Sequence, residues 1–314
     1  MMITQAFVLA AGLGTRLRPL TEELPKPLIP IFQKPLITFV LDHLLGVGIE
    51  SFVINTHHLP APLEKFFAGG TYEGRRVTLV HEPAILGTGG GIKNVKHHLR
   101  PEPFVVYSGD LLTDIDLKHL IAEHFRNRND VTLALRETSH GADVALDGSS
   151  VVDIENRYGH RGQYDFANVS VWNPDIFTRI PPEKNISFIP VLAEWIGAGG
   201  KIGGVVLNER QWFNIGSRAE YLEVHRFIDE RNWKPDYVKT SGWPMRVDPD
   251  AAVDPSARFS GFFSVGPDCR VGADAIVENT ILWPGAQIAS RSHLRNCIVR
   301  SHRKAEGHFS DIDI

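Results

Sequence analysis

The feature of the sequence that most constrains the fold is a six-residue period near its C-terminal end. Apolar residues recur every six positions at Val247, Val253, Phe259, Val265, Val271 and Val277. The spacing is then one residue shorter once, and the six-residue period resumes at Leu282, Ile288 and Leu294. Such a period is typical of a parallel β-helix, in which the repeated apolar side chains point inward and each turn stacks on the one before. The small residues Ala257, Cys269 and Ala275 are then expected inside its corners.

The residues that precede this repeat alternate short apolar runs with segments of helical periodicity. The runs predicted to be strands are 7–9, 52–54, 77–80, 104–107 and 131–135. The predicted helices are 36–45, 117–125 with Asp116 as N-cap, and a segment opened by a capping box from Ser217 to Glu220. Continuous apolar strands separated by helices predict an α/β domain with a mainly parallel sheet. We place this domain at 1–235 and the repeat domain at 244–314.

Charge and composition exclude several classes of function. The formal net charge of −4 on 314 residues leaves no electrostatic footprint for nucleic acid or for an anionic membrane. No apolar stretch reaches the length of a membrane span, and no signal peptide is recognisable. The two cysteines, Cys269 and Cys297, lack metal-ligand or redox spacing. We therefore expect a cytoplasmic protein with neither nucleic acid nor membrane as a partner.

A glycine-rich loop with several cations follows the first predicted strand. Residues 9–28 read LAAGLGTRLRPLTEELPKPL. Glycines directly after a strand allow backbone N–H groups to approach a phosphate, while Arg16 and Lys26 supply positive charge. The loop lacks the Gly-Lys-Ser/Thr of a Walker A motif, and Leu17 stands where a dinucleotide fingerprint needs its third glycine. A phosphate-binding loop of another kind is predicted.

This string resembles the N-terminal signature of the sugar-1-phosphate nucleotidyltransferases, which reads Gly-x-Gly-Thr-Arg, Pro-Leu-Thr and Pro-Lys-Pro. The resemblance covers the whole chain, because one branch of that family also carries hexapeptide repeats. It implies a Rossmann-like fold of the nucleotide-diphospho-sugar transferase type followed by a short left-handed β-helix. It also implies an enzyme that joins a nucleoside triphosphate to a sugar 1-phosphate and releases pyrophosphate. The nucleotide-binding positions that it implies are Leu9, Ala11, Gly12, Gly14, Thr15 and Arg16, with Gly87 and Thr88 in a second glycine-rich loop.

The resemblance further implies a catalytic set and a metal. Arg16, Lys26 and Asp110 are the expected catalytic residues, with Mg²⁺ held by Asp110 and Asn214. Most relatives carry Asp where this chain has Asn214, although the N-acetylglucosamine-1-phosphate uridylyltransferases resemble it in using Asn. An amide oxygen can bind Mg²⁺ but brings no charge. Sugar contacts are expected from Asp143, Glu155 and Asn168.

The sequence leaves the substrates open. The repeats resemble mannose-1-phosphate guanylyltransferases, while the Gly-Thr-Gly-Gly-Gly and Ala-Asp-Val strings resemble N-acetylmuramate-1-phosphate uridylyltransferases and heptose-1-phosphate guanylyltransferases. GTP and mannose 1-phosphate are favoured, with a uridylyltransferase for an N-acetylated sugar 1-phosphate as the alternative. A non-catalytic, nucleotide-sugar-sensing subunit is a further alternative, favoured only by Asn214. We expect a homo-oligomer, with the repeats as its interface or packed on the catalytic domain.

Overall fold

The computed structural model describes residues 2–137, 142–182 and 185–314, which form two compact units. The first unit combines the residues up to Leu13 with Val40–Trp212, and the second combines Gly14–Phe39 with Phe213–Ile314. The glycine-rich signature is therefore divided between the units after Leu13. Folding of 1–235 as an independent domain stays a prediction.

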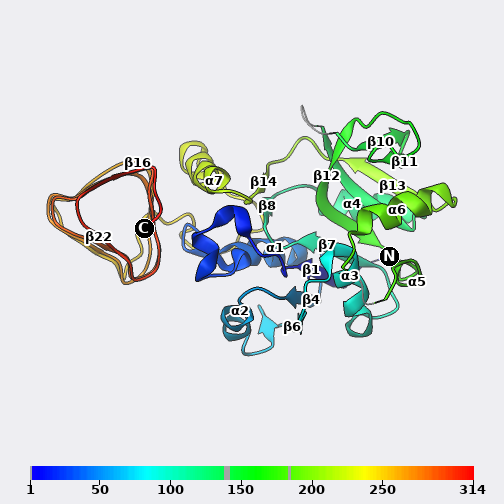
Figure 1. The fold of residues 1–314 in the computed structure, drawn as a ribbon, viewed down its shortest axis with the longest axis horizontal. Coiled ribbons are helices and arrows are strands. Elements are labelled where there is room, and N and C mark those ends of the chain that lie inside the picture. The colour runs from blue at the N-terminus through cyan, green and yellow to red at the C-terminus, as the bar shows by residue number, and fades with distance from the viewer. Residues whose placement is uncertain (1, 138–141, 183–184) are drawn as a thin grey trace. The chain divides into compact units, whose positions relative to one another are not determined.

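A ten-stranded sheet forms the centre of the first unit (Figure 1). Its strands, in spatial order, are β10 (Val144–Asp147), β11 (Ser150–Ile154), β13 (Ile202–Val206), β9 (Val131–Glu137), β12 (Tyr164–Trp172), β7 (Phe104–Ser108), β1 (Gln5–Leu9), β4 (Ser51–Thr56), β6 (Arg75–His81) and β5 (Thr71–Tyr72). All five strands expected from apolar runs in the sequence are present. The short strand β8 (Leu111–Thr113) lies outside this sheet.

The sheet is mixed, which corrects the expectation of a mainly parallel one. Strands β7, β1, β4 and β6 run parallel to one another, but β12 is antiparallel to both of its neighbours, β7 and β9. The hairpin β10–β11 is also antiparallel. A continuous apolar run indicates that a strand is buried and does not reveal its direction. The predicted parallel arrangement holds around β1 and again between β13 and β9.

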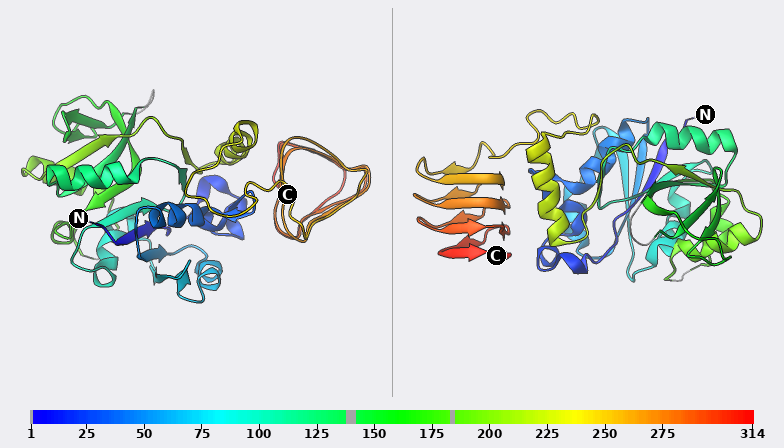
Figure 2. Two further views of the ribbon diagram at one scale, coloured as in Figure 1. Left: turned by 180° about the vertical axis from the view of Figure 1, so that it is seen from behind. Right: turned by 90° about the horizontal axis from the view of Figure 1, so that it is seen from above.

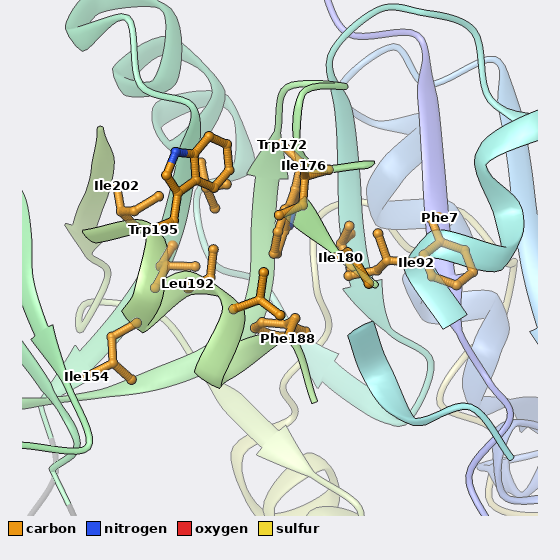
Figure 3. Close-up of a cluster of buried hydrophobic side chains, with 14 of the residues drawn as sticks. Phe7, Ile92, Ile154, Trp172, Ile176, Ile180, Phe188, Leu192, Trp195 and Ile202 are labelled. Carbon is orange, nitrogen blue, oxygen red and sulfur yellow. The ribbon is translucent and has the colours of Figure 1, made fainter. Parts of the chain in front are cut away.

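The helices of the first unit pack against this sheet through a large apolar core. They are α2 (Pro60–Phe66), α3 (Gly87–Asn94), α4 (Leu117–Asn127), α5 (Ile176–Arg179) and α6 (Phe188–Gly197). Figure 3 shows Ile92 of α3 beside Phe7 of β1, with Trp172 of β12 near the α6 residues. As the sequence predicted, Asp116 caps α4 by accepting a hydrogen bond from His119 N at 2.9 Å. The helix α1 (Leu36–Leu45) is also present with the expected bounds.

The N-terminal part of the second unit consists of short turns of helix and a two-stranded hairpin. These elements are η1 (Thr15–Leu17), η2 (Leu20–Glu22), η3 (Lys26–Leu28), β2 (Pro30–Ile31) and β3 (Lys34–Pro35). After β14 (Trp212–Asn214), the chain forms α7 (Arg218–Arg231), and the predicted capping box at Ser217 and Glu220 is confirmed.

The C-terminal residues of the second unit wind into stacked turns, which we call the C-terminal coils (Figure 2). One face stacks β15 (Ala252–Val253), β17 (Arg270–Val271), β19 (Gln287–Ile288) and β22 (Lys304–Ala305), all parallel. Another stacks β16 (Arg258–Val265), β18 (Ile276–Leu282), β20 (His293–Arg295) and β23 (His308–Ser310), with β21 (Ile298–Val299) beside β18. Ala252 pairs with Arg270 and Arg270 with Gln287, so the second of these turns is one residue shorter. This shortening matches the slip in the six-residue period.

Most of the repeated apolar side chains form the core of the coils. Those fully buried are Val265, Val271, Val277, Leu282, Ile288 and Leu294, whereas Val247 is exposed. Cys269 and Ala275 are buried as expected, and Ala257 is half-buried. Both cysteines are free, and burial raises the pKa of the Cys269 thiol to about 11, so it stays protonated at neutral pH.

No helix in the described part of the chain is long and apolar enough to span a membrane.

Candidate active site

The start of the signature loop and Asp110 lie at the same edge of the sheet. Leu9 ends β1 and pairs in register with Ser108 at the end of the parallel neighbour β7. Gly109 N donates to Leu9 O at 2.8 Å, which places Asp110 beside the segment that contains Ala11 and Gly12. In open α/β sheets, ligands bind beyond the carboxyl ends of parallel strands. The first unit therefore brings together four of the expected residues: Leu9, Ala11, Gly12 and Asp110.

The second glycine-rich loop is fixed by its packing against the chain before α6. Gly87 opens α3 with a φ of 68°, and a Cβ at this position would lie 2.7 Å from Ile186 O. Phe188 N donates to Thr88 Oγ1 at 3.2 Å, and Gly89 N donates to Ile186 O at 2.8 Å. Only glycine combines this φ with so close a backbone neighbour. The sequence suggested that these glycines admit a ligand; packing within the first unit is a second reason for them.

A buried hydrogen-bond network joins these two loops, and the sequence alone did not point to it. Asn55 Oδ1 accepts from Ala10 N at 2.7 Å, and Asn55 Nδ2 donates to Glu82 Oε1 at 2.8 Å. Glu82 Oε2 accepts from Leu86 N at 3.2 Å. Glu82 is only 1% exposed, so its carboxylate accepts hydrogen bonds from these protein groups and not from water. A signal existed, because Asn55 and Glu82 each follow a predicted apolar strand closely.

Two of the three expected sugar-contacting residues lie side by side. Glu155 N donates to Asp143 O at 2.8 Å, and both residues are exposed. Glu155 has a φ of 60°, which turns the chain sharply after β11. The region just before Asp143, at 138–141, lies outside the described residues. The structure therefore makes Asp143 and Glu155 neighbours, while their contact with a sugar stays a prediction.

The buried carboxylate of Asp153 organises the loop that carries Glu155. It accepts hydrogen bonds from the backbone N–H groups of Arg157 at 2.7 Å, Tyr158 at 2.8 Å and His160 at 3.0 Å. Burial alone would raise the pKa of Asp153, but the backbone donors outweigh it and hold the pKa below its usual range. Asp153 therefore remains ionised at neutral pH and fixes the loop through its charge.

The third expected sugar residue, Asn168, lies where β12 loses register with β9. The irregularity falls between Phe166 and Ser170, and Asn168 has a φ of 59°. Such bulges redirect a side chain and occur often next to binding sites.

An arginine that the sequence did not single out lies on the neighbouring strand. The Arg136 guanidinium stacks at 4.6 Å on the ring of Trp212, whose Nε1 donates to Ala167 O at 3.0 Å. Arg136 Nε is buried and donates to no residue of the described chain. Burial lowers the pKa of Arg136, and the cross-strand carboxylate of Asp165 opposes that change. A charged donor that lacks a partner is suited to an anionic or hydroxyl group of a substrate.

The remaining signature residues belong to the second unit. Gly14 has a φ of 63°, and its carbonyl accepts a hydrogen bond from Thr21 Oγ1 at 2.9 Å. This geometry requires glycine and starts η1, which contains Thr15 and Arg16, both exposed. Lys26 begins η3 and is 9% exposed.

The second unit brings Arg16 to the segment that contains Asn214. A Cβ at Gly216 would lie 2.7 Å from Arg16 Nη2, so the guanidinium covers this glycine. Gly216 N donates to Glu220 Oε2 at 3.0 Å, which ties the segment to the first turn of α7. Asn214 Oδ1 is buried and accepts no hydrogen bond from the described residues. A buried oxygen without a donor is costly unless something else satisfies it.

This orphaned oxygen fits a magnesium ligand. Within the described ranges, no three or more His, Cys, Asp and Glu side chains gather in a way that could hold a metal. Mg²⁺ does not require such a cage, because it commonly binds one or two protein carboxylates together with substrate phosphates and water. The amide oxygen of Asn214 is a neutral donor of the kind that a hard cation accepts.

The fold is an α/β domain with glycine-rich loops at the carboxyl ends of its parallel strands. Residues 5–231 match the nucleotidyl transferase family, and the chain belongs to it. This confirms the prediction of an enzyme of the sugar-1-phosphate nucleotidyltransferase type.

Similar proteins agree with this assignment. The chain is 30% identical over 293 residues to the mannose-1-phosphate guanylyltransferase of Mycobacterium tuberculosis, covering 90% of this chain and 80% of that protein. It is 32% identical over 226 residues to the D-glycero-α-D-manno-heptose 1-phosphate guanylyltransferase of Aneurinibacillus thermoaerophilus, covering 71% and 97%. The inositol-1-phosphate CTP transferase of T. maritima shares the fold, with a TM-score of 0.61 at 20% identity over 70% of this chain and 92% of that one.

Proposed function

We propose that this nucleotidyltransferase joins GTP to mannose 1-phosphate. The observation that carries the proposal is the similarity to the mannose-1-phosphate guanylyltransferase of M. tuberculosis, because it extends over 90% of this chain. The heptose 1-phosphate relative is also a guanylyltransferase, which supports guanine as the base. UTP is the alternative base, since the chain is 24% identical over 91% of its length to a UTP–glucose-1-phosphate uridylyltransferase of Synechocystis.

In this proposal the sugar phosphate oxygen attacks the α-phosphorus of the triphosphate in line, and pyrophosphate leaves. A phosphate is already a competent nucleophile, so positioning and charge neutralisation provide the catalysis. Lys26 neutralises the two reacting phosphates, and Arg16 holds the departing β and γ groups. The glycine-rich loops bind the nucleotide through Leu9, Ala11, Gly12, Gly14, Thr15, Gly87 and Thr88.

Asp110 and Asn214 are the proposed Mg²⁺ ligands, and the buried, unsatisfied Oδ1 of Asn214 supports this role. Bound Mg²⁺ would supply positive charge to the α-phosphate. Asp110 then carries the protein's negative charge at the metal, while Asn214 contributes a neutral oxygen.

The sugar is proposed to bind near Asp143, Glu155 and Asn168. The Asp153 loop supports this proposal, since it holds Glu155 in one backbone conformation. Arg136 is added to this set because its buried Nε–H has no hydrogen-bond acceptor among the described residues.

The C-terminal coils are proposed to be a left-handed β-helix of hexapeptide repeats. The six-residue period and the parallel stacking of β15, β17, β19 and β22 support this assignment. We further propose a cytoplasmic homo-oligomer, which sizing by light scattering would test.

The experiment that tests the substrates is a panel of triphosphates and sugar 1-phosphates. Each pair is incubated with the enzyme and Mg²⁺, and pyrophosphate and nucleotide sugar are both quantified. GTP with mannose 1-phosphate should give the highest kcat/KM. A preference for UTP with an N-acetylated sugar 1-phosphate would replace the proposed substrates while retaining the reaction.

A further inference from the structure

Two segments that carry proposed catalytic residues form hydrogen bonds and ion pairs with the last turn of the C-terminal coils, residues 296–314. Figure 2 shows this turn, in red, at one end of the stack. All the contacts described below lie within the second unit. The last turn is therefore in direct contact with the part of the chain that contains Arg16, Lys26 and Asn214.

The first anchor holds the segment between Arg16 and Lys26. Arg300 Nη1 donates to Pro19 O at 3.4 Å and to Glu23 Oε1 at 3.3 Å, and Arg303 also pairs with Glu23. The Arg300 side chain is only 14% exposed. Its Nε donates to Ile314 O at 3.3 Å, so the arginine is itself held in place by the coils.

The second anchor holds the segment that follows Asn214. Arg218, in the first turn of α7, donates through Nε to Asp313 Oδ1 at 2.7 Å. Its Nη2 donates to the carbonyl oxygens of Asn296 and Ile312. Since Asp313 is 7% exposed, this ion pair is shielded from water, and a shielded pair constrains geometry more than a surface pair does.

A buried relay adds a third connection just after Lys26. Trp283 Nε1 of the coils donates to Tyr221 Oη at 3.1 Å, and Tyr221 Oη donates to Pro30 O at 2.6 Å. Both ring systems are fully buried. Polar groups in such a relay fix one arrangement, because any shift leaves a buried donor unsatisfied.

We propose that the C-terminal coils position the catalytic segments of the same chain, and that Glu23, Arg300, Arg218 and Asp313 are positioning residues. The inference rests on the proposed roles of Arg16, Lys26 and Asn214. The last turn holds the two segments in place through these contacts. Without an anchor, Arg16, Lys26 and Asn214 would move away from the geometry that turnover requires. A displacement of about 1 Å at a reacting group can cost roughly 100-fold in rate. Loss of one anchor among several should cost less.

The test compares Asp313→Asn and Glu23→Gln, which remove one charge each, with the matched control Glu306→Gln. Glu306 pairs with Lys304 on the exposed surface of the same coils. We expect kcat to fall about tenfold in each anchor variant at 25 °C, with the control within about twofold of the parent. Asp313→Glu should recover part of the lost kcat. The double variant Arg218→Gln with Asp313→Asn should be no slower than Arg218→Gln alone, because Arg218→Gln already removes the contact that Asp313→Asn breaks.

A purely structural role would lower the melting temperature and leave the kcat of the folded enzyme at the parental value, and that result overturns the inference. If Asp313→Asn fails to fold, the half-exposed Glu23→Gln still decides the matter. Lys26→Ala is assayed alongside. Loss of activity in Lys26→Ala with parental kcat in both anchor variants overturns the positioning role alone. Parental kcat in Lys26→Ala overturns the assigned catalytic roles and the inference with them.

Discussion

Replacing Glu82 by glutamine should weaken the link between the two glycine-rich loops that are proposed to bind the nucleotide. The Glu82 carboxylate accepts from Asn55 Nδ2 at 2.8 Å and from Leu86 N at 3.2 Å. Glutamine has the same shape but only one acceptor oxygen, so its NH₂ group must face one of these two donors. One buried donor is then unsatisfied, and the remaining hydrogen bond loses its charge assistance. Together these losses cost about 3 kcal/mol.

The assay is urea unfolding at pH 7.5, followed by tryptophan fluorescence, with hydrogen exchange at the Ala10 and Leu86 amides as a local readout. KM for the triphosphate should also rise about tenfold, because both loops are proposed to hold the nucleotide. Glu64→Gln, an exposed change on α2, is the control. An unfolding free energy of Glu82→Gln within about 0.5 kcal/mol of the parent, the range of neutral surface changes, would refute the reasoning.

Three further predictions concern other parts of the molecule. Asp153→Asn should raise KM for the sugar 1-phosphate about tenfold and leave KM for the triphosphate unchanged, since the loop with Glu155 loosens; equal effects on both KM values would count against it. Asn214→Asp should lower the Mg²⁺ concentration needed for half-maximal turnover, because a carboxylate adds charge at the metal. A Mg²⁺ titration of Asn214→Ala identical to that of the parent enzyme would exclude Asn214 as a ligand. Burial lowers the pKa of His43 to about 3 and of His225 to about 4. Below pH 6.5 the unfolded chain therefore binds more protons than the folded chain. For each of these two histidines, the free energy of unfolding should fall by about 1.4 kcal/mol per pH unit as the pH drops toward 4. A urea midpoint that does not change between pH 6.5 and 5 would contradict this.

The elements that the sequence predicted well are those with a strong local signal. The α1 helix, the Asp116 cap and the Ser217 capping box each depend on residues a few positions apart, and all are present. The six-residue period likewise reports the inward side of the coils directly, down to the slip after Val277.

What the sequence did not predict depends on contacts between distant residues. The antiparallel direction of β12 is set by pairing with β7 and β9, which an apolar run does not encode. The Asn55–Glu82 link and the Arg218–Asp313 pair join positions far apart in the chain. Asn55 and Glu82 each follow a predicted strand closely, but these residue types are common on surfaces, so a single sequence does not show which of them pair. The family was recognisable because the glycines and cations of its signature lie within one short segment of the sequence.

The most direct test of the proposed mechanism is the turnover of Lys26→Ala against the parent. GTP, mannose 1-phosphate and Mg²⁺ are supplied at saturation, and pyrophosphate and nucleotide sugar are quantified together. Lys65→Ala, which removes an exposed lysine on α2, serves as the control. The parent should form both products in equal amounts, and Lys26→Ala should be at least about 100-fold slower while remaining folded. Turnover of Lys26→Ala near the parental rate would contradict the central role of this lysine.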